Sequence, residues 1–227
     1  MNIVAKKKFI ETQGLFKRMS HEICIVIESY YIWRTLTFAR SIPEVGQEQA
    51  DKNAKLMAIY KDFFIPTEQS HLHTFIIGLM KFFDKNPRAL SVAGLAREIE
   101  RNKDIFTVDI VRSIYPDLAR IGAVEDNYVP INQEVINSIN QLRENHETLI
   151  TNLKNIRDKQ CAHTDMETIK GTFVPLEIET LIEAIQETLN GLSGIFDLSS
   201  TTWDHLKHDS IGSTQFLLKN LERGGAY

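Results

Sequence analysis

Residues 139–165 read INQLRENHETLITNLKNIRDKQCAHTD, and their apolar positions recur at alternating steps of three and four. The side chains that share this face are Ile139, Leu142, His146, Leu149, Leu153 and Ile156. Such a period is typical of a helix face that packs against a partner. The next two positions on the same face are Gln160 and His163, and Arg157 lies beside them. The pattern predicts one long helix, from about residue 133, whose packed face ends in polar side chains.

The same helical periodicity runs through the rest of the chain. It predicts helices from residue 9 or 15 to 39, over 49–64, over 67–83, a short one that Ser91 caps, and helices over 107–121 and from Pro175 to 196, with one or two shorter helices in the tail from Ser199. Pro66 is expected to stop a helix, and Pro116 to kink or break one that Gly122 closes. Segment 125–132 is expected to be a loop, with at most a short strand. The predicted fold class is therefore all-α, a helical bundle.

The composition fits one large domain or a domain with an appendage. The 227 residues are 43% hydrophobic and carry a formal net charge of −4, so no overall basic field indicates nucleic-acid binding. Any contact with RNA or DNA would need a local basic patch. Two cysteines, Cys24 and Cys161, are too few for a disulfide framework and lack metal-ligand spacing. This cysteine usage fits a reducing compartment.

The most apolar segment is ICIVIESYYIWRTLTF, at residues 23–38, and it is interrupted by Glu28 and Arg34. It falls short of the roughly 20 predominantly apolar residues that span a bilayer, so we expect a buried helix. The first residues, MNIVAKKKFI, are followed by no apolar run of signal-peptide length. The expected location is cytoplasmic, with no membrane partner.

Arg157 and His163 are residue types that together suit phosphate chemistry. Histidine titrates near neutrality and can move protons, and the guanidinium fork of arginine suits a phosphate. The pairing fits RNA cleavage by the ribose 2'-hydroxyl, which leaves a 2',3'-cyclic phosphate and needs no metal. On an α-helix, residues six apart differ by about 120° in direction and by about 9 Å in rise, so one helix does not present both on one face. Two copies packed about a two-fold axis would bring both pairs to one cleft.

A simpler interpretation is also open from the spacing alone. A lone histidine on an apolar stripe is more often a satisfied core residue, and Arg157 would then be a solvated residue on its flank. Periodicity does not separate these two interpretations of His163. In the tail, His205 and His208 have a spacing that would suit a metal, but no further ligand cluster lies nearby, so no metal site is predicted.

The spacing of Arg157, Asp158 and, after four further residues, His163 resembles the signature of the HEPN superfamily, the higher-eukaryote and prokaryote nucleotide-binding domains. Two longer stretches are similar to the abortive-infection AbiU type of this superfamily. One is HLHTFIIGLMKFFDKNPRALSVAGLAREIE at residues 71–100, with a helix, an aspartate, a serine-capped turn and a second helix, and the other is RDKQCAHTD at residues 157–165. The resemblance covers roughly residues 15–197.

The resemblance implies an all-α, HEPN-like helical bundle with additional helices over residues 1–198 and a helical C-terminal extension over residues 199–227. It also implies a homodimer. In active members of the superfamily, that dimer is a metal-independent endoribonuclease of toxin–antitoxin or phage-defence systems and uses no cofactor. Carried over by position, Arg157 would stabilise the phosphate, His163 would act as general acid or base, and Asp158 would orient the site.

RNA is the expected partner, and Lys154, Lys159 and Lys170 are candidates to contact its phosphate backbone. An antitoxin is a further candidate partner. Some HEPN toxins carry a tyrosine two residues after the histidine, which a nucleotidyltransferase antitoxin modifies; here that position is Asp165, so silencing by that route is not expected. Two alternatives stay open: a non-catalytic HEPN module that binds RNA, a nucleotide or an antitoxin, and a purely structural helical dimer with His163 in its core.

Overall fold

The computed structural model describes residues 3–86, 89–131, 133–161 and 173–224, and this part of the chain contains helices and no strand. The elements, in chain order, are α1 (Ile3–Phe38), α2 (Ile42–Val45), α3 (Gln47–Ile59), α4 (Lys61–Phe82), α5 (Val92–Arg101), η1 (Lys103–Ile105), α6 (Val108–Ile114), α7 (Pro116–Arg120), α8 (Ala123–Asn127), α9 (Gln133–Asn145), α10 (Glu147–Ile156), η2 (Arg157–Cys161), α11 (Pro175–Phe196) and α12 (Asp204–Gly224). The all-α prediction is confirmed.

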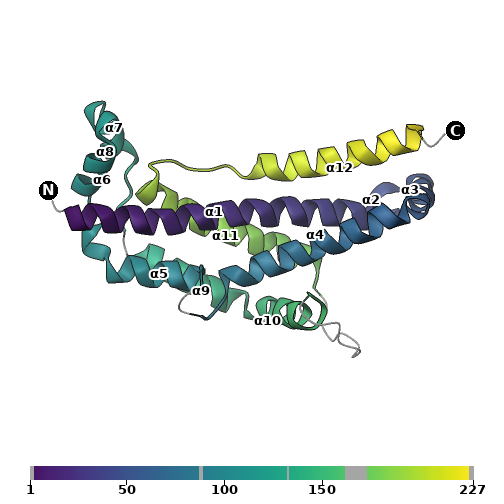
Figure 1. Ribbon diagram of the computed structural model, residues 1–227, viewed down its shortest axis with the longest axis horizontal. Coiled ribbons are helices and arrows are strands. Elements are labelled where there is room, and N and C mark those ends of the chain that lie inside the picture. The colour runs from purple at the N-terminus through teal and green to yellow at the C-terminus, as the bar shows by residue number, and fades with distance from the viewer. Residues whose placement is uncertain (1–2, 87–88, 132, 162–172, 225–227) are drawn as a thin grey trace.

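The long helix α1 forms the axis of an elongated bundle (Figure 1). Helices α4, α11 and α12 all pack against it. The short helices α6 to α8 gather near its N-terminal end, and α2 and α3 lie at its C-terminal end (Figure 1). In the same view, α12 runs along one side of α1, whereas α10 lies on the other side, beyond α4.

Segment 23–38 is a buried part of α1, as its interrupted apolar sequence predicted. Its buried side chains include Ile23, Val26, Ile27, Tyr30, Tyr31 and Leu36. In the described part of the chain, no helix combines the length and the apolarity that crossing a bilayer requires.

Several predicted local features are confirmed. The Ser91 hydroxyl caps α5 by accepting a hydrogen bond from the Gly94 N–H at 3.2 Å. Gly122 adopts a left-handed conformation with φ of 75° after α7, and the helix predicted over 107–121 breaks at Tyr115, directly before Pro116. Helix α11 begins at Pro175, as predicted, and one of its faces is buried: Ile178, Leu181, Ile182, Ile185, Leu189, Leu192 and Phe196.

The prediction that Pro66 stops a helix was wrong. The break falls at Tyr60, with φ of −103° and ψ of 33°, and Pro66 lies inside α4. Phe64, which is 1% exposed, packs with Leu36, Leu56 and other residues of a second apolar cluster. Burial of this side chain offsets the backbone hydrogen bond that proline cannot donate.

The predicted long helix from residue 133 was also wrong, because it is two helices that separate at His146. α9 packs against α5 and α11, whereas α10 packs against α4. Arg143 in α9 donates a hydrogen bond of 3.0 Å to the Phe83 carbonyl, just after the end of α4. The apolar period is continuous across the break, but α9 and α10 pack against different helices.

Three further boundaries differ from the sequence-based expectation. The first helix starts at Ile3, before the expected residues 9 to 15, and α8 occupies the first part of the segment expected to be a loop. The tail holds one helix, α12, which agrees with the expected one or two, but at 21 residues it is longer than expected. Trp203, directly before it, is buried, whereas Phe216 on α12 is 66% exposed.

A close approach of α1 and α4 generates a first prediction. A Cβ atom added at Gly78 in α4 would lie 2.5 Å from Val26 Cγ2 in α1, whereas one added at Gly191 in α11 would meet nothing within 4 Å. Alanine gains up to about 1 kcal/mol of helix propensity at either site, but overpacking costs about 1–3 kcal/mol. We expect Gly78→Ala to lower the free energy of unfolding by about 1 kcal/mol, and Gly191→Ala to raise it.

Urea unfolding followed by circular dichroism measures both values. Equal stabilisation by the two substitutions would contradict the close α1–α4 packing.

Candidate functional site

The candidate site begins where α10 ends. Leu153 and Ile156, in the last turn of α10, are buried against the core, at 0% and 3% exposure. From Arg157 to Cys161 the chain then forms a π-helical turn, η2, which packs against α4. Single π turns within helices are rare and occur frequently at functional sites.

This π turn corrects the geometry expected from the sequence. The offset of about 120° between Arg157 and His163 assumed a regular α-helix throughout. The backbone hydrogen bonds of η2 follow the wider i→i+5 pattern, so the α-helical rotation per residue does not apply between Arg157 and Cys161.

Arg157 and Asp158 form a charged pair on the π turn. The Arg157 Nε and Nη2 atoms lie 2.8 Å and 2.6 Å from the same carboxylate oxygen, Asp158 Oδ1. The two side chains are partly open to solvent, at 31% and 47% exposure. Asp158 therefore contacts the Arg157 guanidinium on a partly exposed turn, and the catalytic roles of both residues stay predictions.

The predicted lysines occupy different positions around this pair. Lys154 is exposed on α10, three residues before Arg157, a spacing that places neighbours on one side of a helix. Lys159 is half-buried within η2. His163 and Lys170 lie in residues 162–172, outside the described part of the chain, so their predicted roles stay predictions.

The chain on both sides of residues 162–172 contacts α4. η2 packs against α4 before this segment. After it, the Phe173 ring lies 6.0 Å from the Phe75 ring of α4 and 5.6 Å from the Trp33 ring of α1. The sequence-based analysis missed Phe173; the only signal was an aromatic residue inside the turn sequence GTFVP.

A partly buried polar network holds the start of α11, which follows Phe173. The Tyr30 hydroxyl lies 2.8 Å from the Pro175 carbonyl and 3.1 Å from Glu179 Oε1, and Arg34 Nε lies 3.0 Å from the same Glu179 oxygen. Burial, and secondarily the Glu179 carboxylate, raises the pKa of Tyr30 far above its ordinary value. The Tyr30 hydroxyl therefore ties α1 to the beginning of α11.

His146, at the junction of α9 and α10, lines an acidic cleft of about 370 Å³ with Glu144, Glu147 and Glu177 among its walls. Burial lowers the pKa of His146, and it also lowers the pKa of His71 on α4. Within the described ranges, no group of three or more histidine, cysteine, aspartate or glutamate side chains could hold a metal ion. His205 and His208, in the tail, each place Nδ1 against a backbone carbonyl, at 3.0 Å and 2.7 Å.

Comparison with known proteins identifies one family. The family model HEPN_AbiU2, described as AbiU2, matches residues 9–217. The match therefore extends beyond the resemblance at residues 15–197 and includes most of α12; the division of the chain at residue 198 stays a prediction. Neither the comparison with curated proteins nor that with solved structures gives a match.

The burial of His146 generates a second prediction. Because burial favours the neutral imidazole, the unfolded chain binds more protons than the folded chain below about pH 6.5, so the free energy of unfolding falls as the pH falls through this range. Replacing His146 with glutamine removes this proton uptake. We expect His146→Gln to reduce the loss of stability between about pH 7.5 and about pH 5.

Urea unfolding at the two pH values measures the change, with His21→Gln, at an exposed residue of α1, as the matched control. If both variants lose as much stability on acidification as the wild type, burial does not determine the titration of His146.

Proposed function

Because the chain belongs to the AbiU2 family of HEPN domains, we propose that it is a metal-independent endoribonuclease of a toxin–antitoxin or phage-defence (abortive-infection) system. The observation that carries the proposal is the Arg157–Asp158 pair, with both Arg157 contacts made to Asp158 Oδ1 on a partly exposed π turn. A fixed guanidinium open to solvent suits a phosphodiester, whose oxygens it can meet with its planar fork.

In the proposed reaction, a base removes the proton from the ribose 2'-hydroxyl, and the 2'-oxygen attacks the adjacent phosphorus. The bond from phosphorus to the 5'-oxygen breaks, and an acid returns a proton to that leaving oxygen. His163 supplies the acid or the base, Arg157 stabilises the negative charge that develops on the phosphoryl oxygens, and Asp158 orients Arg157. The products are a 2',3'-cyclic phosphate and a 5'-hydroxyl.

RNA is the proposed substrate, and Lys154, Lys159 and Lys170 are the proposed contacts to its backbone. The position of Lys154 supports this, since it is exposed and lies three residues before Arg157 on the adjoining helix. Each such contact releases counterions, so the affinity for RNA should fall steeply with salt concentration.

We also propose a homodimer in which the two α10–η2 ends face each other. A composite site would draw Arg157 from one chain and His163 from the other, as a two-fold axis through facing helix ends allows. An antitoxin partner and a cytoplasmic location belong to the same proposal.

The third prediction tests the catalytic roles by RNA cleavage in EDTA. We expect wild-type protein to keep its rate in EDTA, and Arg157→Ala and His163→Ala each to lower it by about a hundredfold or more. Arg157→Lys should recover only part of the rate because lysine lacks the planar fork. The double variant should be scarcely slower than either single variant, since both residues act on one transition state.

Arg120→Ala, at an exposed arginine on α7, is the matched control and should leave the rate unchanged. Wild-type protein that binds labelled RNA without cutting it would favour the non-catalytic alternative. Protein that neither binds nor cuts RNA, with His163→Ala unfolded, would favour a structural role for His163.

The fourth prediction tests the composite site. We expect light scattering of wild-type protein at about ten micromolar or above to give the mass of a dimer. Mixing inactive Arg157→Ala with inactive His163→Ala, followed by subunit exchange, should restore about a quarter of the wild-type activity, because half of the dimers are mixed and each then holds one intact site.

A matched mixture of Arg157→Ala with the Arg157→Ala/His163→Ala double variant should restore nothing. A monomeric mass, or no recovery in a mixture whose subunits have exchanged, would contradict a shared site.

A further inference from the structure

His73, on α4, is a histidine to which the proposed mechanism gives no role. It is half-buried, and among the described residues its ring has no hydrogen-bond or ion-pair partner. By contrast, His205 and His208 each hold Nδ1 against a backbone carbonyl. Both ring nitrogens of His73 are therefore available to a ligand.

The side of α4 on which His73 lies is not the side that meets α1. The Phe75 ring faces α1, where its centre lies 5.4 Å from that of the Tyr30 ring. His73 instead shares a row, at steps of three and seven residues, with Ile76 and Met80. Ile76 and Met80 are buried, at 0% and 3% exposure. α10 and η2 also pack against α4, and this row is the side that they cover, since α1 occupies the other buried side.

The register between α10 and α4 places His73 beside the end of α10. Arg143, close to the start of α10, donates its hydrogen bond to the Phe83 carbonyl at the end of α4, so α10 starts near that end. Because η2 still contacts α4, α10 runs back along it. The ten residues of α10 rise about 15 Å, and about ten residues of α4 cover the same length. Counting back from Phe83 therefore brings the end of α10 to the neighbourhood of His73.

Arg157 lies at the edge of this contact between α10, η2 and α4. The residues one and two helical turns before it, Leu153 and Ile150, are buried, whereas Arg157 is half-buried. Lys154 follows Ile150 by one turn and is exposed, so it lies on the same edge, farther into solvent. On α4, the half-buried His73 marks the border between the covered row and the exposed side. Arg157 and His73 thus border the same contact from its two sides.

A histidine at this place would complete the chemistry of the proposed cleavage. A base takes the proton of the ribose 2'-hydroxyl, and an acid gives a proton to the leaving 5'-oxygen. The mechanism assigns one residue, His163, to these two transfers. With a second histidine, the proton that one ring gains in a turnover equals the proton that the other ring loses, and exchange with water restores both.

We propose that His73 is the second proton-transfer residue, and that it acts together with Arg157 of its own chain. The proposal rests on the ribonuclease function proposed above. In the reacting complex, the His73 ring contacts the 2'-oxygen or the 5'-oxygen, His163 contacts the other of these two, and Arg157 contacts the phosphoryl oxygens.

The fifth prediction compares His73→Gln and His73→Asn with His71→Gln, the matched control. His71 is also half-buried on α4, but it lies in the row of Phe75, which faces α1. We expect both His73 variants to lower kcat for RNA cleavage by about a hundredfold and to leave KM within about twofold of the wild type. His71→Gln should keep the wild-type kcat. Urea unfolding followed by circular dichroism checks that the variants are folded.

A substrate with a better leaving group distinguishes an acid from a base. When sulfur replaces the bridging 5'-oxygen of the scissile phosphate, the leaving thiolate needs no proton, so a variant that lacks the acid regains most of its rate. We expect this substrate to rescue one, and only one, of His73→Gln and His163→Ala.

Mixing of subunits tests whether His73 and Arg157 act from one chain. His73→Gln should behave in every mixture as Arg157→Ala does, because both changes damage the same half of the site. With His163→Ala the two variants should therefore recover equal activity, and a mixture of His73→Gln with Arg157→Ala should recover none.

Cleavage by both His73 variants at the rate of His71→Gln would overturn the proposal and leave the ribonuclease function standing. So would rescue of both or of neither histidine variant by the sulfur substrate, or recovery when His73→Gln is mixed with Arg157→Ala. Wild-type protein that cuts no RNA would overturn the proposed function and the role of His73 together.

Discussion

The packing of α1 against α4 is the contact on which the other elements depend. Gly78 leaves no side chain between the two helices, so Val26 fills the space where a Cβ atom would lie. Next to this contact, the Tyr30 ring meets the Phe75 ring edge-on, with 5.4 Å between the ring centres. Large buried aromatic rings in fixed relative orientations contribute strongly to core stability and restrict how the helices can shift. The pair of helices thus forms a rigid wall for the elements on either side.

The chain on both sides of the candidate site packs against this pair of helices. α10 and η2 pack on α4, so the exposed pair of Arg157 and Asp158 is held on a rigid base although its own turn is irregular. Phe173 contacts both α1 and α4, and Tyr30 holds the start of α11 through Glu179. The proposed cleavage would need Arg157 to be held closely against a phosphate, and packing of this kind can supply such positioning.

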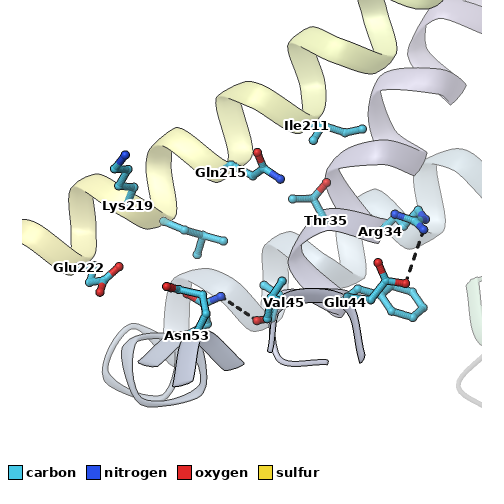
Figure 2. Close-up of a pocket in the computed structure, with 13 residues that line it drawn as sticks. Arg34, Thr35, Glu44, Val45, Asn53, Ile211, Gln215, Lys219 and Glu222 are labelled. Carbon is cyan, nitrogen blue, oxygen red and sulfur yellow. Dashed lines mark hydrogen bonds and ion pairs between the residues drawn. The ribbon is translucent and has the colours of Figure 1, made fainter. Parts of the chain in front are cut away.

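Arg34, on α1, lies close to both α11 and α12. It contacts Glu179, which holds the beginning of α11, and it also lines a cavity between α1, α2, α3 and α12 (Figure 2). The side chain of Lys207, on α12, lies 5.0 Å from the Tyr31 ring centre and 4.0 Å from Glu179 Oε2. The tail helix is therefore tied to the same network as α11, and it is part of the family match up to residue 217.

Much of the fold could be predicted because the relevant signals are local. The start of α11 at Pro175, the serine cap of α5 and the glycine after α7 follow from local backbone preference, and the structure confirms them. The break at His146 could not be predicted, since the apolar period is the same on both sides and only the packing partners differ. The π turn could not be predicted either. A hydrophobic period does not determine whether each backbone N–H bonds to the carbonyl four or five residues before it.

The residues of the candidate site could likewise be predicted only in part. Motif spacing made Arg157 and Asp158 candidates, and in the structure these two side chains form an ion pair, while their roles stay predictions. It could not identify Phe173 or Glu179, because their roles arise from contacts with α1 that are distant in sequence. The roles of His163 and Lys170 rest on the resemblance, since both residues lie outside the described part of the chain.

The central claim is that the pair on the π turn serves phosphodiester cleavage by the ribose 2'-hydroxyl. Mass spectrometry of the ends of an RNA oligonucleotide, incubated with purified protein in EDTA, tests this claim most directly. The account predicts fragments with a 2',3'-cyclic phosphate at one new end and a 5'-hydroxyl at the other. Fragments that instead carry a 3'-hydroxyl and a 5'-phosphate would contradict it, because water and not the 2'-oxygen would then be the attacking nucleophile.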